Sequence, residues 1–351
     1  MTTQDPGQFT PALLTDLRGL IAETRERVAA AVNAGMTLLY WRIGERIQRE
    51  ILKGERAEYG KEIVAAVARQ LTEEFGSSFS AKHLRRMVQF AEVFPDPEIV
   101  APLARQLSWS HFTILIPIDE PIKRDFYAEM CRVERWSRRT LRAKIDSMLF
   151  ERTAISRKPD QVAKAELEAL RLEDRLSPSM VFKDPYVLDF LGLQDRYLEK
   201  DLEDAILREI ERFLLELGEG FAFVARQKRL VIDGEDFTLD LLFYHRRLRR
   251  LIAIELKLGR FKAGYKSQME LYLRWLEKHE TQPGEESPLG IILCAETGHE
   301  QLELLQLDQA GIHVAQYLTG LPPKEVLLRR LRIAIEESRE RFGAGGGGEA
   351  E

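Results

Sequence analysis

The sequence predicts a mostly helical N-terminal half followed by an α/β half in which helices flank a mixed central sheet. From Ala12 to Arg152, apolar residues recur at the spacings of three and four that indicate amphipathic helices. After a helix expected at 198–217, the chain is rich in β-branched and aromatic residues, which predict strands at 221–232, 237–244 and 251–256. The change from helical spacing to strand-forming segments supports two different architectures within one chain.

The remaining elements of the second half alternate between helix and strand. We expect a helix at 265–279, a strand at 290–294, a helix near 301–309 and a strand at 312–316. Asp233-Gly234 is typical of the tight turn that joins two antiparallel strands. A sheet flanked by helices is the natural architecture for this order of elements.

The length of 351 residues favours two domains over one. We place a helical domain at 1–155, a charged linker at 156–178 that is bounded by proline-containing turns, and the α/β domain at 179–340. Residues 341–351 are expected to be a disordered tail, because Gly343 to Glu351 contain five glycines and no large apolar side chain.

The composition narrows the cellular setting. The longest apolar runs are too short to cross a bilayer and no signal pattern begins the chain, so we expect a cytoplasmic protein without a membrane partner. Only Cys131 and Cys294 are present, which predicts reduced, structural thiols and no four-thiolate zinc site.

The net charge of −5 does not favour nucleic-acid binding, but the basic residues are concentrated locally. Six basic side chains accompany one acid between Arg132 and Lys144, and eleven accompany five acids between Arg226 and Lys266. Arg226, Lys262 and Lys266 are therefore candidates for nucleic-acid contacts in the second half. Solvated charged faces are the alternative interpretation.

Two short segments of the first half combine a serine cap with basic residues. Ser80 and Ser137 are each placed to begin a helix, one carrying Arg85 and Arg86 and the other Arg138 and Arg139. Either helix could be the recognition helix of a helix-turn-helix unit that docks on DNA. An ordinary amphipathic helix with a charged outer face fits the pattern as well.

The candidate chemistry lies on two of the expected strands. Asp240 lies between leucines, and Glu255 and Lys257 interrupt an apolar strand, where alternation puts both on the same side. Buried carboxylates need compensation, which a divalent cation, Mg²⁺ or Mn²⁺, would supply by binding Asp240, Glu255 and the backbone carbonyl of Leu256. Lys257 would then stabilise negative charge on a phosphoryl oxygen. A structural ion pair is the alternative.

Two helical residues extend this hypothesis. Glu203 lies on the apolar stripe of the helix at 198–217, where it could bind the same ion or a second one, or simply reach water. Gln268, on the helix at 265–279, could position water or a phosphate, although a surface glutamine fits the spacing equally well.

These residues also carry a resemblance to a known family. The segment from Phe237 to Lys257, with Glu203 before it and Gln268 after it, resembles the PD-(D/E)XK nuclease superfamily. Longer motifs make the whole chain similar to the bacterial YhcG-like nucleases; they include Leu107 to Phe112, Trp136-Ser137, Lys183 to Leu191, Phe213 to Gly218 and Asp240 to His245.

The resemblance implies a restriction-endonuclease-like core in which Asp240 and Glu255 bind magnesium and Lys257 assists hydrolysis of a phosphodiester. Glu203 and Gln268 would be accessory helix positions, and the first half a DNA-binding or winged-helix-like module. One departure is visible, since Ala225 stands where such proteins usually have glycine before Arg-Gln. The resemblance therefore predicts a magnesium-dependent nuclease.

DNA is the expected substrate, and RNA is not excluded by any residue. A homo-oligomer is expected by analogy with nucleases of this fold that cut two strands as dimers. The competing hypothesis is a non-catalytic binding module for nucleic acid or protein on a nuclease scaffold, because fold does not dictate function.

Overall fold

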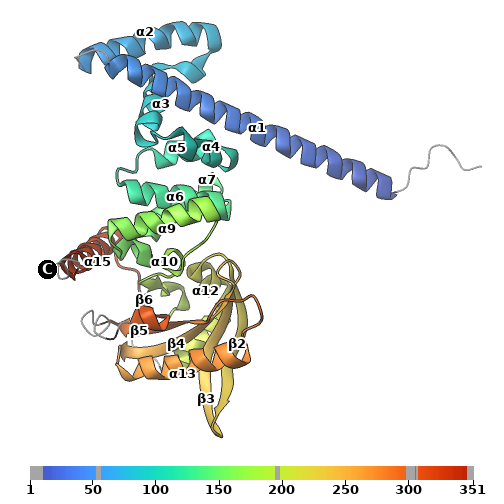
Figure 1. Cartoon of the computed structure of the whole chain (residues 1–351), viewed down its shortest axis with the longest axis vertical. Coiled ribbons are helices and arrows are strands. Elements are labelled where there is room, and N and C mark those ends of the chain that lie inside the picture. Colours follow the sequence, from blue (N-terminus) through green and yellow to red (C-terminus); the bar gives the residue numbers. More distant parts are fainter. Residues whose placement is uncertain (1–10, 53–56, 194–197, 298–304, 306, 346–351) are drawn as a thin grey trace, which may run out of the picture. The chain divides into compact units, whose positions relative to one another are not determined.

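The computed structural model describes residues 11–52, 57–193, 198–297, 305 and 307–345 (Figure 1). The chain divides into two compact units, one ending at Ala143 and the other beginning at Lys144. Most of the helix expected near 301–309 lies outside the described residues. Within them, no helix combines the length and apolar character needed to cross a membrane.

The first unit is built from helices, and its described residues contain no strand. The prediction of a mostly helical first half is confirmed. The β-hairpin wing that a winged-helix module would have is absent from residues 11–52 and 57–143. The elements are α1 (Pro11–Leu52), α2 (Ala57–Phe75), η1 (Ser77–Phe79), α3 (Ala81–Val93), α4 (Pro97–Gln106), α5 (Trp109–Leu115), α6 (Pro121–Glu134) and the start of α7 (Arg138–Asp146).

Helices α1 and α3 cross at a glycine. A Cβ atom on Gly44 would lie 1.8 Å from the carbonyl oxygen of Met87, so only glycine allows the two backbones this close. The buried side chains of Ile47, Leu84 and Met87 form the core around the crossing. The C-terminal half of α1 is thereby fixed to its own unit.

The serine caps of the first unit differ in how they act. The Ser137 hydroxyl accepts a hydrogen bond from the backbone N–H of Thr140 and so caps α7, as predicted. Ser80 precedes α3 in the cap position, but its hydroxyl makes no capping bond and lies 3.2 Å from Nδ1 of His83. Both helices begin where the sequence places them.

The second unit contains a six-stranded mixed sheet in the order β1-β6-β5-β4-β3-β2. Strands β2, β3 and β4 are antiparallel neighbours, whereas β5, β6 and β1 continue from β4 in parallel. The strands are β1 (Tyr186–Val187), β2 (Phe221–Ile232), β3 (Glu235–His245), β4 (Arg250–Arg260), β5 (Leu289–Glu296) and β6 (Ile312–Leu318). The predicted mixed sheet is confirmed; the two-residue β1 has no periodicity that a sequence reading could detect.

Helices cover both faces of this sheet. Leu242 and Tyr244 of β3 join the cluster formed by α13 (Gly264–His279), whereas Phe243 between them contacts Phe213 of α12 (Ile210–Leu217). Because neighbouring side chains of a strand point to opposite faces, α13 and α12 lie on opposite sides. The helix expected at 198–217 is two helices, since one residue, Glu209, separates α11 (Glu199–Arg208) from α12.

The segment expected to be a linker, 156–178, is helical in the structure and belongs to the second compact unit. It begins in η2 (Ala154–Arg157) and forms α9 (Asp160–Glu173), which buries Ala163, Leu167 and Leu170. The backbone carbonyls of Ser156 and Arg157 accept hydrogen bonds from α15 (Lys324–Gly345). Three apolar residues at helical spacing suffice to bury this helix among many charges.

The segment between Ala143 and α9 also packs on the second unit. Met148, which precedes α8 (Leu149–Arg152), contacts Leu327 and Leu331 of α15. The two compact units divide between Ala143 and Lys144, whereas the boundary predicted from sequence falls at residue 155. The disordered tail was expected from 341, yet α15 continues to Gly345; residues 346–351 lie outside the described part of the chain. α10 (Pro178–Val181) and η3 (Asp189–Leu191) flank β1, and η4 (Leu307–Ala310) precedes β6.

Candidate active site

Asp240 and Glu255 lie on the adjacent strands β3 and β4. The backbone N–H of Leu256 donates to Oδ2 of Asp240 at 2.9 Å, and the backbone N–H of Asp240 donates to Oε1 of Glu255 at 3.3 Å. Each carboxylate is thus held by the backbone of the opposite strand. The antiparallel register of Leu241 with Ile254 fixes this arrangement.

Lys257 emerges beside Glu255, as the alternation of side chains predicts. Its Nζ atom lies 2.8 Å from Oε2 of Glu255, and the ion pair is almost completely buried. Burial and the nearby Asp240 charge raise the pKa of Glu255 to about 7. Burial opposes the charge of Lys257, but the carboxylates of Glu255 and Asp240 hold its pKa above the ordinary value.

Glu203 of α11 brings a third carboxylate to the same place. Only 8% of this residue is exposed, and its Oε1 atom has no hydrogen-bond partner among the described residues. Its other oxygen accepts a 2.6 Å hydrogen bond from Nε2 of Gln227, which lies 3.4 Å from Oδ1 of Asp240. One amide group therefore lies between two carboxylates.

Burial raises the pKa of both carboxyl groups next to this amide. For Glu203 the hydrogen bond from Gln227 opposes the effect and the charge of Asp240 adds to it. For Asp240 the backbone N–H of Leu256 and the charge of Lys257 oppose it. The site thus concentrates negative charge in a poorly solvated place, where a cation would be stabilising.

A cavity of about 370 Å³ opens onto these groups. Its lining consists of Glu199, Lys200, Glu203, Asp204, Arg226, Gln227 and Asp240. The exposed Arg226 is therefore a cationic group, with Lys200, in the lining of a mostly acidic cavity. This arrangement suits an anionic substrate that approaches a cation held by the acids.

The sequence reading missed three residues of the site. Gln227 has a φ of 44°, a backbone conformation unusual for a strand residue, which no sequence pattern indicated. Glu199 accepts a hydrogen bond from the backbone N–H of Leu258, so α11 is fixed to β4 beside Lys257. Tyr265 of α13 has its ring 5.3 Å from the Lys257 ammonium group, a cation–π contact.

Gln268 does not touch the carboxylates directly. Its Nε2 atom donates to the hydroxyl of Tyr272 at 2.7 Å, and that hydroxyl donates to the carbonyl of Thr238 on β3. Burial raises the pKa of Tyr272, and the charges of Glu255 and Asp240 add to this effect. Gln268 is thus connected to the site through a tyrosine.

The predicted basic residues are distributed unevenly around the site. Lys266 donates to the carbonyl of Leu305 and lies 3.6 Å from Glu270, whereas Lys262 is exposed between β4 and α13. Arg85, Arg138 and Arg139 are exposed in the first unit, and Arg86 is partly buried there. Arg226 is the predicted cation that lines the acidic cavity.

The donor set fits a hard divalent cation, since Glu203, Asp240 and Glu255 offer carboxylate oxygens and one of these oxygens is buried and unpartnered. In the described residues no three acidic, histidine or cysteine side chains are close enough to form a ready cation cage. The carboxylates are instead engaged by protein groups. Lys257 pairs with Glu255, and the N–H of Leu256 donates to Asp240. Gln227 lies between Asp240 and Glu203.

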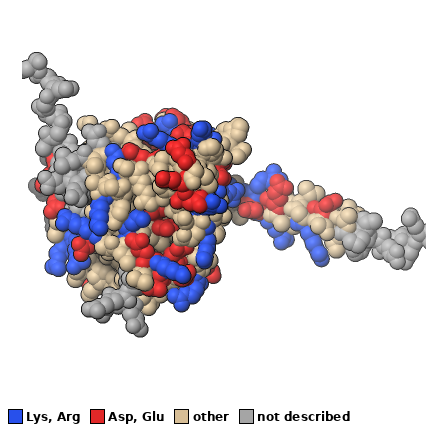
Figure 2. Space-filling model, turned by 90° about the horizontal axis from the view of Figure 1, so that it is seen from below, with Lys and Arg blue, Asp and Glu red and all other residues tan. Residues whose placement is uncertain are grey.

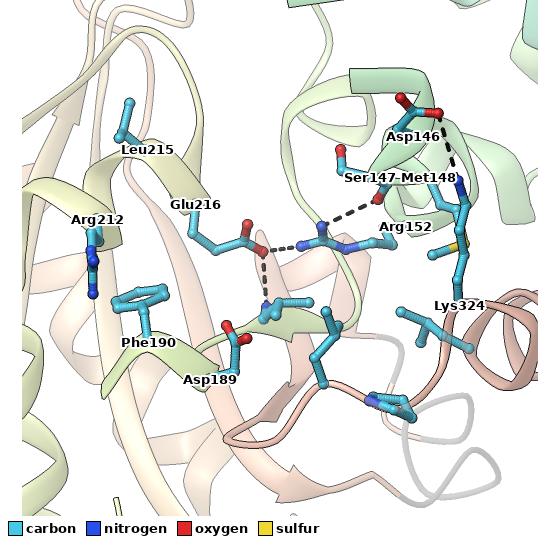
Figure 3. A pocket seen from close by; sticks show the side chains of 14 residues that line it. Asp146, Ser147, Met148, Arg152, Asp189, Phe190, Arg212, Leu215, Glu216 and Lys324 are labelled. Carbon is cyan, nitrogen blue, oxygen red and sulfur yellow. Dashed lines mark hydrogen bonds and ion pairs between the residues drawn. The ribbon is translucent and has the colours of Figure 1, made fainter. Parts of the chain in front are cut away.

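A second, larger cavity of the same unit lies beside the motif that begins at Lys183 (Figure 3). Its volume is about 510 Å³, and Arg152 and Glu216 form an ion pair in its wall. Glu216 also accepts from the backbone N–H of Val187, and Lys183 donates to the backbone carbonyl of Glu216. The segment that begins at Lys183 is thus fixed to α8 and α12 by the Arg152–Glu216 ion pair and by hydrogen bonds to Glu216.

The sheet order, the two carboxylates on adjacent strands and the lysine two residues beyond the second one define a nuclease of the PD-(D/E)XK class. Residues 179–332 match the family model described as the YhcG PDDEXK nuclease domain, and residues 16–152 match the DUF1016 N-terminal domain.

A relative from Escherichia coli (strain K12), the protein YhcG, is 33% identical over 92% of this chain and 94% of its own length. The chain belongs to the YhcG-like nuclease family. Among solved structures, a repair endonuclease from Pyrococcus abyssi is 22% identical with a TM-score of 0.26, over 37% of this chain and 50% of its own. An EndoMS complex with double-stranded DNA is 17% identical with a TM-score of 0.27, over 37% of this chain and 49% of its own.

Proposed function

We propose that this chain is a magnesium-dependent deoxyribonuclease that hydrolyses phosphodiester bonds at the site of Glu203, Asp240, Glu255 and Lys257. The observation that carries the proposal is the unpartnered Oε1 of Glu203, buried beside Asp240. A buried carboxylate oxygen without a donor is costly unless a ligand supplies the missing charge.

Magnesium would be held by carboxylate oxygens of Asp240, Glu255 and Glu203 with the backbone carbonyl of Leu256, and it would supply Lewis acidity and orientation for the phosphate. Lys257 presents its ammonium group to the negative charge that accumulates on the phosphoryl oxygens. Tyr265 and Glu199 restrict the position of Lys257 and the strand that carries it. Manganese suits the same oxygen donors.

The remaining predicted residues take binding or supporting roles in this proposal. Arg226 and Lys262 would contact phosphates near the cavity, while Gln268, through Tyr272, would steady the strand that carries Asp240. Lys266, which already has two partners, would contribute only to the local potential. Arg138 and Arg139 lie in the first turn of α7, where the helix dipole adds to their positive charge, and they would bind the DNA backbone together with Arg85 and Arg86.

The test is incubation of the full chain with supercoiled plasmid, linear duplex, single-stranded DNA, a four-way junction and RNA. Each substrate is combined with magnesium, manganese or a chelator. Cleavage of DNA that requires the metal supports the proposal. Cleavage of RNA alone would assign a ribonuclease, and binding without cleavage of every substrate would assign a non-catalytic module.

Two variants make the test specific. Asp240→Asn removes a carboxylate of the site and is expected to abolish cleavage while leaving DNA binding in place. Asp236→Asn is the matched control, because Asp236 lies on the same strand, exposed, in an ion pair with Arg229. Equal activity of the two variants would contradict the proposed site.

A further inference from the structure

One aromatic side chain of the second unit is exposed on strand β2. Phe223 is 41% exposed, and no other phenylalanine, tyrosine or tryptophan whose side chain the structure describes in this unit is exposed. β2 is the last strand in the sheet order, so no further strand of the described chain lies beyond it (Figure 1). A single exposed apolar residue is common on protein surfaces, so its meaning depends on the groups beside it.

A shift in the strand register puts Phe223 and Arg226 on the same face of the sheet. Phe223 pairs with Phe243 and Arg226 with Leu241, and the register shifts between Phe223 and Ala225. Directly paired residues share a face, and so do Phe243 and Leu241, which are two positions apart on β3. In a regular strand, residues three positions apart would point to opposite faces. The two side chains are therefore neighbours, about 7 Å apart along the strand.

The shared face is the one that carries the proposed active site. On this face Phe243 contacts Phe213 of α12. Arg226 lines the acidic cavity together with Glu203 and Asp240. Arg226 makes no hydrogen bond or ion pair with the described residues, so its guanidinium group is available to a ligand. The exposed ring of β2 thus lies next to a cation that is itself next to the acids.

The ring of Phe223 is held in place by the core of the unit. It meets the fully buried ring of Phe243 edge to face, with 5.4 Å between the centroids and 67° between the planes. Part of the ring remains open to solvent. A fixed aromatic surface beside a cation is the combination on which proteins stack the bases of single-stranded nucleic acid.

We propose that Phe223 stacks on an unpaired nucleobase next to the scissile phosphate, while Arg226 binds the phosphate of the same nucleotide. This inference rests on the proposed nuclease function and names its substrate class: single-stranded DNA, or DNA with unpaired nucleotides at the cleavage site. In a duplex the bases are stacked on one another, so a base could reach the ring only after leaving the stack. The occupant is a nucleotide because the groups beside the ring, an arginine and a cluster of cation-binding acids, are those that bind phosphate.

The first experiment compares the affinity of the full chain for a single-stranded oligonucleotide and for a blunt duplex of the same sequence. Fluorescence anisotropy measures both, and every protein carries Asp240→Asn so that no cleavage occurs. Phe223→Leu keeps an apolar side chain against Phe243 but removes the stacking surface. It should weaken single-strand binding about 5–100-fold, the effect of one lost base–aromatic contact, and leave duplex binding unchanged.

Two further variants serve as controls. Phe75→Leu makes the same substitution at a ring of the first unit that is 64% exposed, and it should bind both DNAs like the parent. Phe223→Tyr keeps an aromatic ring and should retain single-strand affinity. Equal single-strand affinity of Phe223→Leu and its parent would overturn the proposal. Equal losses on single strand and duplex would also overturn it, because the ring would then serve the fold or a general surface.

A second experiment locates the stacked base. Labelled single strands each carry one abasic nucleotide, and cleavage of the bonds around it is followed with magnesium and intact Asp240. At one position next to the cleaved bond, the missing base should slow the wild type about as much as Phe223→Leu slows cleavage of the intact strand. The Phe223→Leu protein should be indifferent to the missing base there. Additive effects of variant and abasic nucleotide at every position would mean that ring and base do not meet.

The two experiments separate this inference from the proposed function. Binding is measured without cleavage, so a chain that cuts no substrate but loses single-strand affinity in Phe223→Leu would support the stacking site and contradict the nuclease. Metal-dependent cleavage that Phe223→Leu leaves unchanged on every substrate would contradict the stacking site and support the nuclease.

Discussion

A carboxyl group that is buried beside a second carboxylate keeps its proton at a higher pH than one in water. Glu255 meets this condition, with 3% of the residue exposed and Asp240 on the neighbouring strand, and its pKa of about 7 is well above the ordinary value of 4.5. Between these two values the folded state binds more protons than the unfolded chain. The free energy of unfolding therefore falls as the pH rises through this window, and the loss is complete above pH 7.

This linkage gives a stability prediction for the metal-free protein. Between pH 4.5 and pH 7, the wild type should lose about 3 kcal/mol of unfolding free energy relative to Glu255→Gln, whose amide does not titrate. Denaturant titrations in the presence of a chelator at several pH values measure the difference. Asp236→Asn, exposed on β3, should follow the wild-type curve. Parallel curves for the wild type and Glu255→Gln would show that Glu255 titrates normally.

Gln227 has a backbone φ of 44°, and its side-chain amide lies between two carboxylates. This combination indicates that Gln227 positions the carboxylates of Glu203 and Asp240. Replacing it by leucine should reduce DNA cleavage about 10–100-fold and weaken magnesium binding, because Glu203 and Asp240 lose the donor that orients them. Gln227→Gly should lose as much cleavage without loss of stability, since glycine adopts the φ of 44° readily.

Cleavage assays, magnesium calorimetry and thermal unfolding together separate the two effects. If both Gln227 variants keep wild-type cleavage, the amide has no positioning role. If Gln227→Gly is as unstable as a core variant, the amide is structural.

The charged residues of the site could be named from sequence because each interrupts an apolar pattern. Asp240 lies between leucines, Glu255 and Lys257 interrupt the most apolar strand, and Glu203 lies on an apolar stripe. Gln227 had no such signal, since a polar residue on an exposed strand looks ordinary and no local pattern encodes its positive φ. Glu199 and Tyr265 reach the site through tertiary packing, which no local pattern encodes.

At the scale of elements, the strands were predictable where periodicity and turn residues agreed. The sequence predicted β2 with the observed bounds and placed β3 and β4 within a few residues, because Asp233-Gly234 marks the turn between β2 and β3. Helix α9 was predicted only as a short helix-like stretch within a linker, because its three buried residues lie among charged neighbours. The short β1 depends on pairing with β6 and leaves no local pattern.

The close crossing of α1 and α3 predicts that one added methyl group at Gly44 lowers the free energy of unfolding. Gly44→Ala would bring Cβ within 1.8 Å of the Met87 carbonyl oxygen, so the helices must separate, and the expected loss of unfolding free energy is about 1–3 kcal/mol. Gly35→Ala is the matched control on the same helix, since nothing lies within 4 Å of its added Cβ. It should be neutral or stabilising by about 0.5–1 kcal/mol through helix propensity. Thermal unfolding monitored by circular dichroism decides the comparison, and equal effects would contradict the close crossing.

The buried ion pairs around Glu216 connect α12 with α8 and with the segment beginning at Lys183. Glu216→Gln removes the carboxylate that pairs with the nearly inaccessible Arg152 and lies 3.7 Å from the Lys183 ammonium nitrogen, and it should reduce the free energy of unfolding by about 3 kcal/mol. Glu211→Gln, exposed on the same helix, serves as the control. Denaturant titration of the full chain would show the difference. A Glu216→Gln protein as stable as the Glu211→Gln protein would mean that water enters this cavity freely.

At the scale of the whole molecule, the net charge of −5 means that any DNA-binding surface must be local. Figure 2 agrees with this, since blue and red side chains are interspersed over the face that it shows. The first two turns of α7 are one such place, where Arg138, Arg139 and Arg142 are all exposed. Electrostatic binding of this kind depends on salt, because each phosphate contact releases bound cations.

The salt dependence gives a prediction for the full chain. Replacing both Arg138 and Arg139 by alanine should weaken binding to a short duplex and reduce the slope of the logarithm of affinity against the logarithm of salt concentration by about 2, one unit for each lost phosphate contact. Arg46→Ala with Arg49→Ala is the matched control, because these exposed arginines are already paired with Glu50 and Glu45 on α1. Fluorescence anisotropy at several salt concentrations measures both slopes. An unchanged slope for the α7 variant would remove this helix from the DNA interface, whereas equal reductions in both variants would mean that DNA responds to overall charge and not to a defined surface.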